Sequence, residues 1–188
     1  MPPYLPAMFC TAVFISMSDW PSPTSRAAAQ PAATADTPVD CTGLRGGPRL
    51  TYRNPRYGFS LTHPSFFVLD PDSVPASGDS ARFWTTDRRA TAVVTGLRNG
   101  LGQSLSDLMR EAKRDIVENG HGTISYKRIR GDWFVISGYI ADRIFYRRTF
   151  LSQDRSIIAT LWIEFPRDMR PCFDEAVTMM SLSFRAAA

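Results

Sequence analysis

The chain has 188 residues, of which 44% are hydrophobic and 21% charged, a composition that excludes an intrinsically disordered protein and favours one globular domain. It carries 22 basic and 18 acidic side chains, and every basic residue except Lys113 and Lys127 is an arginine. Acidic residues are interspersed among the arginines, so the clustered basic surface typical of nucleic-acid-binding proteins is missing. The composition therefore argues against a nucleic-acid partner.

Residues 1–29 have the features of a signal peptide. The apolar stretch 7–17 is too short to span a bilayer but has the length of a signal-peptide core, and cleavage is expected after Ala29. No lysine or arginine precedes the apolar stretch, a departure that a misassigned start codon would explain. We expect a periplasmic or secreted protein without a transmembrane helix in the mature chain. The alternative is an N-terminal tail with no role in export.

Residues 30–49 are rich in Pro, Ala, Thr and Gly and predict a flexible linker, so the folded domain is expected over residues 50–185. Its first strands are predicted before Gly58 and over residues 59–63, and Pro64 ends the second of them. Residues 65–81 indicate a loop. A hairpin is predicted next, with strands at 82–86 and 90–96.

A helix is predicted between Ser104 and Gly120. Ser104 is expected to cap it, Asp107 supplies the capping-box partner three residues later, and apolar residues follow at helical spacing. A second helix is predicted after Pro166, with Asp168 as its cap and Pro171 in the first turn. Its buried stripe is expected to consist of Phe173, Ala176, Val177 and Met180.

Between the two helices, residues 124–166 form four apolar runs separated by short polar turns, a pattern typical of an antiparallel meander. In the last run, Leu161 and Ile163 alternate with Trp162 and Glu164, so the two pairs are expected on opposite faces of the strand. The fold class predicted from these elements is α+β, a largely antiparallel sheet flanked by at least two helices.

Cleavage of the leader would leave two cysteines, Cys41 and Cys172. In an exported protein, two distant cysteines favour one disulfide bond. The alternative is a pair of buried free thiols in a cytosolic protein. No Cys-x-x-Cys or Cys/His cluster indicates a zinc or redox site.

The domain resembles members of the PsbP-like superfamily, a group that includes exported bacterial domains. The resemblance spans residues 50–185 and is carried by turn and core residues in five segments: 52–64, 78–79, 133–138, 144–146 and 183–184. It implies an antiparallel sheet flanked by helices, and it implies a binding or assembly factor rather than an enzyme. It offers no catalytic residues to transfer to this chain.

No catalytic, cofactor-binding or metal-ligating residue is assigned. His63 and His121 lack the neighbouring nucleophile and carboxylate of a hydrolytic triad, and Ser104 is interpreted as a helix cap. The glycine-rich segment 96–102 lacks the P-loop lysine and the Rossmann glycine spacing. The Arg-Gly-Asp tripeptide at 130–132 is interpreted as a hairpin turn.

The best candidate for a binding surface lies on neighbouring strands of the meander, where arginine and aromatic residues recur. It comprises Tyr146, Arg148, Trp162 and Glu164, with an Arg beside Trp able to form a cation–π pair or to hold a carboxylate. The sequence thus predicts a non-catalytic exported domain that binds a protein or cell-envelope component, without a cofactor. A hydrolase that acts on the envelope and a purely structural envelope factor stay open as alternatives.

Overall fold

A computed structural model describes residues 39–186, and the predicted signal peptide and most of the predicted linker lie outside this range. The strands are β1 (Arg49–Arg53), β2 (Ser60–Pro64), β3 (Phe67–Asp70), β4 (Ser80–Thr85), β5 (Thr91–Arg98), β6 (Thr123–Arg130), β7 (Trp133–Ile140), β8 (Arg143–Leu151) and β9 (Ile157–Pro166). The α-helices are α1 (Leu105–Arg114) and α2 (Arg170–Ser183). None of the described helices is long and apolar enough to cross a bilayer.

Seven of these strands form one antiparallel sheet in the order β3-β4-β5-β9-β8-β7-β6. β1 and β2 pair with each other in a separate two-stranded sheet. The predicted hairpin is β4–β5, and the predicted meander is β6–β9, so both predictions are confirmed. The Arg130-Gly131-Asp132 segment turns the chain between β6 and β7, where Gly131 adopts a positive φ of 56°.

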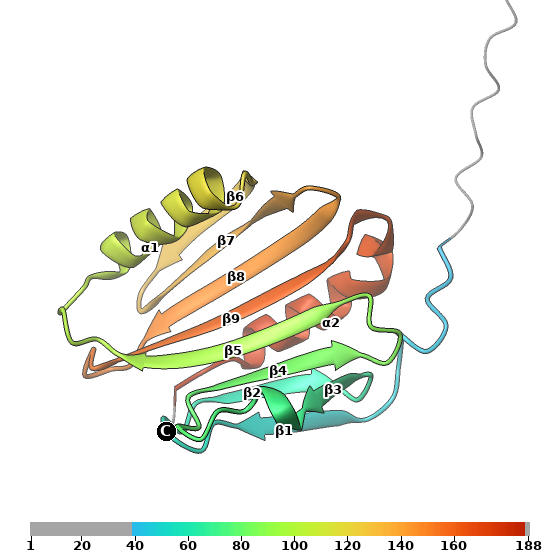
Figure 1. Ribbon diagram of the computed structural model, residues 1–188, viewed down its shortest axis with the longest axis horizontal. Coiled ribbons are helices and arrows are strands. Elements are labelled where there is room, and N and C mark those ends of the chain that lie inside the picture. The colour runs from blue at the N-terminus through green and yellow to red at the C-terminus, as the bar shows by residue number, and fades with distance from the viewer. Residues whose placement is uncertain (1–38, 187–188) are drawn as a thin grey trace, which may run out of the picture. The chain divides into compact units, whose positions relative to one another are not determined.

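The two helices pack on opposite faces of the large sheet (Figure 1). The alternation of β9 explains this arrangement, because Leu161 and Ile163 join the core under α2, whereas Ile158 joins the core under α1. We call these two sides of the sheet the α2 side and the α1 side. The α2 side holds the larger core, which contains eight buried phenylalanines: Phe59, Phe66, Phe67, Phe83, Phe150, Phe165, Phe173 and Phe184.

Helix α1 begins with the predicted capping box. The Ser104 hydroxyl accepts a hydrogen bond from the Asp107 backbone N–H, and the Asp107 carboxylate accepts one from the Ser104 backbone N–H. These bonds satisfy two of the donors that a helix start leaves unpaired. The helix continues into a π-turn at Asp115–Asn119 and ends at Gly120, as predicted.

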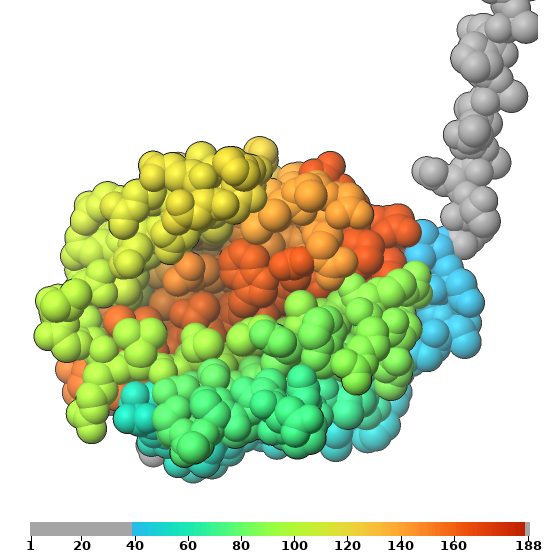
Figure 2. Space-filling view, in the orientation of Figure 1, coloured from blue at the N-terminus to red at the C-terminus, as the bar shows by residue number. Residues whose placement is uncertain are grey.

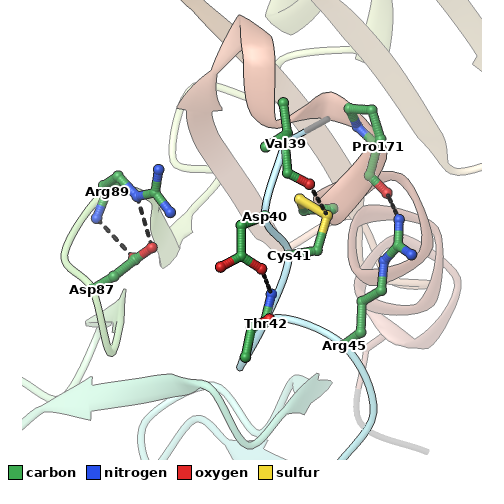
Figure 3. The surroundings of a disulfide bond; sticks show 9 residues. Val39, Asp40, Cys41, Thr42, Arg45, Asp87, Arg89 and Pro171 are labelled. Carbon is green, nitrogen blue, oxygen red and sulfur yellow. Dashed lines mark hydrogen bonds and ion pairs between the residues drawn. A yellow bond between two sulfur atoms is a disulfide. The ribbon is translucent and has the colours of Figure 1, made fainter. Parts of the chain in front are cut away.

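A disulfide joins Cys41 to Cys172 across 131 residues of sequence, which confirms the predicted pairing (Figure 3). Cys172 lies in the first turn of α2, and Arg45 donates a hydrogen bond of 3.1 Å to the backbone carbonyl of Pro171 in the same turn. Leu44 is buried in the larger core. The residues just before β1 therefore pack against α2.

Three predictions about the elements and the linker differ from the structure. The loop predicted over residues 65–81 contains β3, a short strand at the edge of the sheet. Asp168 does not cap α2, because it lies in a 3-10 turn, Arg167–Met169, that precedes the helix. The linker predicted over residues 30–49 includes residues from Cys41 onward that belong to the packed structure, because the disulfide and Leu44 hold them there.

Candidate functional site

The four residues of the predicted binding face do not share one side of the sheet. Tyr146 lies opposite Ile163 and Arg148 opposite Leu161, so both point to the α2 side. Trp162 and Glu164, which alternate with those two partners along β9, point to the α1 side. The grouping of these four residues on one face was wrong. The sequence shows which residues alternate within one strand, but it does not show the register between two strands. A shift of one residue reverses the side.

On the α2 side, Arg148 lies in a partly buried cluster with an aromatic ring. Its guanidinium carbon is 4.6 Å from the centroid of the Trp133 ring, and its Nη1 donates a hydrogen bond of 3.3 Å to Ser181 Oγ of α2. The Arg148 Nε is buried without a hydrogen-bond partner. Burial lowers the pKa of Arg148, and no carboxylate in residues 39–186 forms an ion pair with it. Arg148 is thus a partly buried cation that forms no ion pair among the described residues.

Tyr146 connects this cluster to helix α2. The Tyr146 hydroxyl and Ser181 Oγ are 2.6 Å apart. Burial raises the pKa of Tyr146, although the hydrogen bond to Ser181 opposes the shift. The phenol therefore stays protonated at neutral pH and available as a hydrogen-bonding group.

A cavity of about 330 Å³ adjoins Tyr146 on the α2 side of β6, β7 and β8. We call it the tyrosine pocket, because Tyr126, Tyr139 and Tyr146 line it together with Ser137, and the first turns of α2 contribute Arg170 and Asp174. Its volume falls at the lower end of the roughly 300–1,000 Å³ typical of ligand sites. Phenol rings and hydroxyl groups give such a cavity both apolar contact area and hydrogen-bonding groups.

Charged residues flank the tyrosine pocket. The Arg167 guanidinium carbon lies 4.1 Å from the centroid of the Tyr139 ring, and Arg167 also donates a hydrogen bond to the Ala141 carbonyl. Arg170 forms an ion pair with Asp174 at 3.5 Å, one turn further along α2. Both partners of this pair are about two-thirds exposed, so it contributes little stability and its groups are accessible to a ligand.

The other two predicted residues belong to a tighter polar network on the α1 side. Arg143 forms an ion pair with Glu164, and Trp162 Nε1 donates a hydrogen bond of 3.3 Å to the same carboxylate. The Trp162 ring stacks on Phe145 with centroids 5.1 Å apart. Trp162 and Glu164 therefore make their main side-chain contacts with neighbouring residues of the large sheet.

The arginine beside Trp162 is Arg147 rather than Arg148, because Arg147 is its cross-strand partner. Burial lowers the pKa of Arg147, and its Nε donates a hydrogen bond of 3.3 Å to Thr149 Oγ1. Figure 2 shows this side of the molecule recessed between α1, in yellow, and the green strands β4 and β5. Among the described residues, no carboxylate forms an ion pair with Arg147.

The two histidines occupy unrelated places. His63 is buried, its Nδ1 lies 3.0 Å from the Pro64 carbonyl oxygen, and its ring centroid is 4.8 Å from that of Phe83. Burial lowers the pKa of His63. His121 is exposed and adopts a positive φ of 49° just after α1. Neither histidine has a hydrogen bond to a described carboxylate or serine, and residues 39–186 contain no group of three metal-ligating side chains.

Other cavities of the described residues lie outside the tyrosine pocket. One of about 280 Å³ lies beside the disulfide and is lined in part by Arg45, Gly47 and Glu175. A larger and more open one, about 700 Å³, lies between the start of α1 and the β6–β7 turn, with Ile129 and Leu151 on its walls. The Gly96–Gly102 segment of the sequence leads from β5 into α1 and lines neither cavity.

Sequence reasoning missed the tyrosine pocket, although it singled out Tyr146. Tyr126 and Tyr139 lie on adjacent strands, and a β-bulge at Ser125 sets the register that brings Tyr126 opposite Ser137. The contribution of α2 depends on how that helix crosses the sheet. The recurrence of tyrosines in three consecutive strands was the one available signal.

No protein-family profile matches the chain, and no curated protein sequence matches it significantly. Solved structures do match. The solution structure of cyanobacterial PsbP (CyanoP) from Synechocystis has a TM-score of 0.59 at 12% identity, covering 79% of this chain and 98% of that one. The crystal structure of the Saccharomyces cerevisiae Ran-binding protein Mog1p has a TM-score of 0.56 at 9% identity, covering 75% and 96%.

A mutant of Mog1 matches in the same way, with a TM-score of 0.58 at 9% identity and coverage of 76% and 97%. Identities this low show the shared fold and leave function open. The described residues therefore have the α+β fold of PsbP and Mog1, as the sequence resemblance implied.

Proposed function

We propose that this protein is a non-catalytic, exported binding or assembly domain that acts on a protein or cell-envelope component, and that the partner binds at the tyrosine pocket and the adjoining Arg148. The observation that carries the proposal is Arg148 itself. A partly buried guanidinium with an unpartnered Nε and no ion pair in the described chain leaves part of its desolvation cost uncompensated. A partner that supplies acceptors there would offset that cost.

The tyrosine pocket supports the same location. Tyrosine and arginine are enriched where proteins bind partners, because each combines a large apolar surface with a polar end. Tyr126 is about half exposed at the entrance, whereas Tyr146 is held by Ser181. Such a combination of fixed and accessible groups suits recognition.

Two observations support export and a binding role. The Cys41–Cys172 disulfide is typical of proteins outside the reducing cytosol, which agrees with the predicted signal peptide and a periplasmic or secreted location. Among structures with the same fold, Mog1p is described as a Ran-binding protein, so this fold is compatible with protein binding. No observation in residues 39–186 favours the alternative of an envelope hydrolase.

Affinity capture from envelope extract tests the proposal. The oxidised protein is compared with the variants Arg148→Glu and Tyr126→Ala, and with Arg114→Glu as a matched control for charge reversal at an exposed position on α1. We expect one or more captured components to be lost with both site variants and retained with the control. Each is then purified and its binding remeasured.

Circular dichroism and thermal unfolding must first show that the variants are folded, and Arg148→Gln replaces Arg148→Glu if the latter is not. Equal recovery of every component by the wild type and both site variants would exclude this surface as the binding site.

A further inference from the structure

A second surface, which adjoins the tyrosine pocket at Tyr126, lies at the free edge of β6. β6 is the last strand of the large sheet, so its outer backbone N–H and C=O groups have no strand partner in the described chain. Seven of its eight residues are exposed. The β-bulge is confined to Ser125, so Tyr126–Arg130 pairs regularly with β7 and presents a regular outer edge.

This edge is cationic on both sides. Arg128 and Arg130 lie opposite Val135 and Trp133, residues of the α2 side, whereas Lys127 lies opposite Ile136 of the α1 side. No acidic residue occurs in β6. None of these three cations forms an ion pair with a described carboxylate. An extended strand beside β6 would therefore meet positive charge whichever way its side chains alternate.

We propose that β6 binds an extended acidic segment of a protein partner, which adds to the sheet as an eighth strand. The open backbone edge supplies hydrogen bonds to the main chain of such a segment, and Arg128 and Arg130 pair with its carboxylates across the strands. A membrane surface fits less well, because β6 offers a linear row of backbone groups that lipids do not use and α2 projects on the arginine side.

The cavity of about 700 Å³ adds a further feature of the partner. It opens on the α1 side of β6, and the exposed Ile129 forms part of its wall together with Leu105 and Leu151. A side chain from an added strand beside Ile129 points to this side. We infer that the acidic segment carries an apolar residue at the position that faces Ile129.

A charged edge strand also has a purely protective role, since charge and a bulge discourage association between sheets. The protective role and the proposed binding role predict different results when a peptide strand is added. Protection alone requires the edge to reject every strand, whereas the proposed site accepts an acidic strand and rejects a basic one.

The test uses the oxidised protein and a capped seven-residue peptide in which glutamate alternates with threonine. One comparison peptide has lysine in place of glutamate. A second keeps the glutamates but carries N-methyl groups on alternate residues, so that it retains charge and loses strand pairing. Binding is followed by backbone amide NMR and amide hydrogen exchange. The protein variants are Arg128→Glu/Arg130→Glu and the control Arg98→Glu/Arg114→Glu, which reverses two exposed arginines elsewhere.

We expect the acidic peptide to give saturable shifts in β6 and slower amide exchange there. Affinity should fall about tenfold or more when Arg128 and Arg130 are reversed, because two favourable cross-strand pairs become repulsive. The control variant should bind as the wild type does. The residue that faces Ile129 in this arrangement is a threonine, and replacing it with valine or leucine should strengthen binding because an apolar side chain there meets the apolar wall of the cavity.

The proposal is overturned if the acidic peptide gives no saturable shift in β6 or if the lysine peptide binds with equal affinity. Equal affinity for the N-methylated peptide would also overturn it, because the interaction would then be unspecific charge attraction. Shifts confined to the tyrosine pocket would also overturn it while leaving the proposed function intact. Arg128 and Arg130 do not line that pocket, so the double reversal tests the β6 edge without changing a residue of the pocket.

Discussion

Single residues in this fold show how far burial changes the chemistry of polar groups. His63 and Arg148 are both shielded from water on the α2 side, but the protein contacts that replace their hydration differ. The His63 ring contacts Phe83 and has one backbone acceptor. Arg148 keeps a charge that is only partly satisfied by Trp133 and Ser181. His63 is therefore a neutral core residue, whereas the Nε of Arg148 is buried without a hydrogen-bond partner among the described residues.

The buried His63 should make stability depend on pH. Its pKa is lowered from 6.5 because burial disfavours the charged form, so below pH 6.5 the unfolded chain binds more protons than the folded one. The free energy of unfolding should therefore fall as pH decreases from 6.5 toward the lower folded-state pKa. Urea unfolding of the wild type and of His63→Gln at pH 7 and pH 5 measures this. A wild-type slope as flat as that of the variant would refute the assignment.

At the scale of elements, α1 depends on its N-terminal cap, since Ser104 and Asp107 satisfy each other's backbone donors. The Ser104 hydroxyl lowers the pKa of Asp107. The sequence predicted this capping box because its two residues, Ser104 and Asp107, lie within one four-residue segment. β3 was missed for the opposite reason, because its four residues lie between Pro64 and Pro71 and are recruited only by pairing with β4.

Ser104→Ala should destabilise the protein by about 1 kcal/mol, because it removes the acceptor for the Asp107 backbone N–H. Ser106→Ala is the matched control, since Ser106 is exposed in the first turn and has no described hydrogen bond from its side chain. Denaturant unfolding of both variants gives the comparison. Equal stability of the two variants would show that the Ser104 cap does not stabilise α1.

At the scale of the whole molecule, the sequence predicted the sheet, the helices and the disulfide, because each has a local or compositional signature. It did not predict which side of the sheet each candidate binding residue faces. Tyr146 and Trp162 lie on adjacent strands, but the side of the sheet on which each falls depends on the β8–β9 register and on which face α2 covers. Both are tertiary properties that no single segment encodes.

Removing the disulfide should test how strongly it restrains the fold. Its two cysteines are 131 residues apart, and the chain-entropy estimate for such a loop is up to about 5 kcal/mol. Cys41→Ser/Cys172→Ser should therefore lower the free energy of unfolding by up to that amount, with the free segment before β1 becoming more accessible to protease. Unfolding curves and limited proteolysis of the variant and the oxidised wild type measure both effects. Unchanged stability would show that the packing of Leu44 alone holds the segment.

The same bond also fixes an order of events during synthesis. Cys41 precedes all nine described strands, whereas Cys172 lies in the helix that follows the last of them. Because a chain is made from its N-terminus, the first thiol emerges long before its partner exists. Oxidation of this pair can only follow the synthesis of α2, so the bond forms only in a nearly complete domain. A chain truncated before α2 would keep Cys41 as a free thiol, which cellular quality control can recognise.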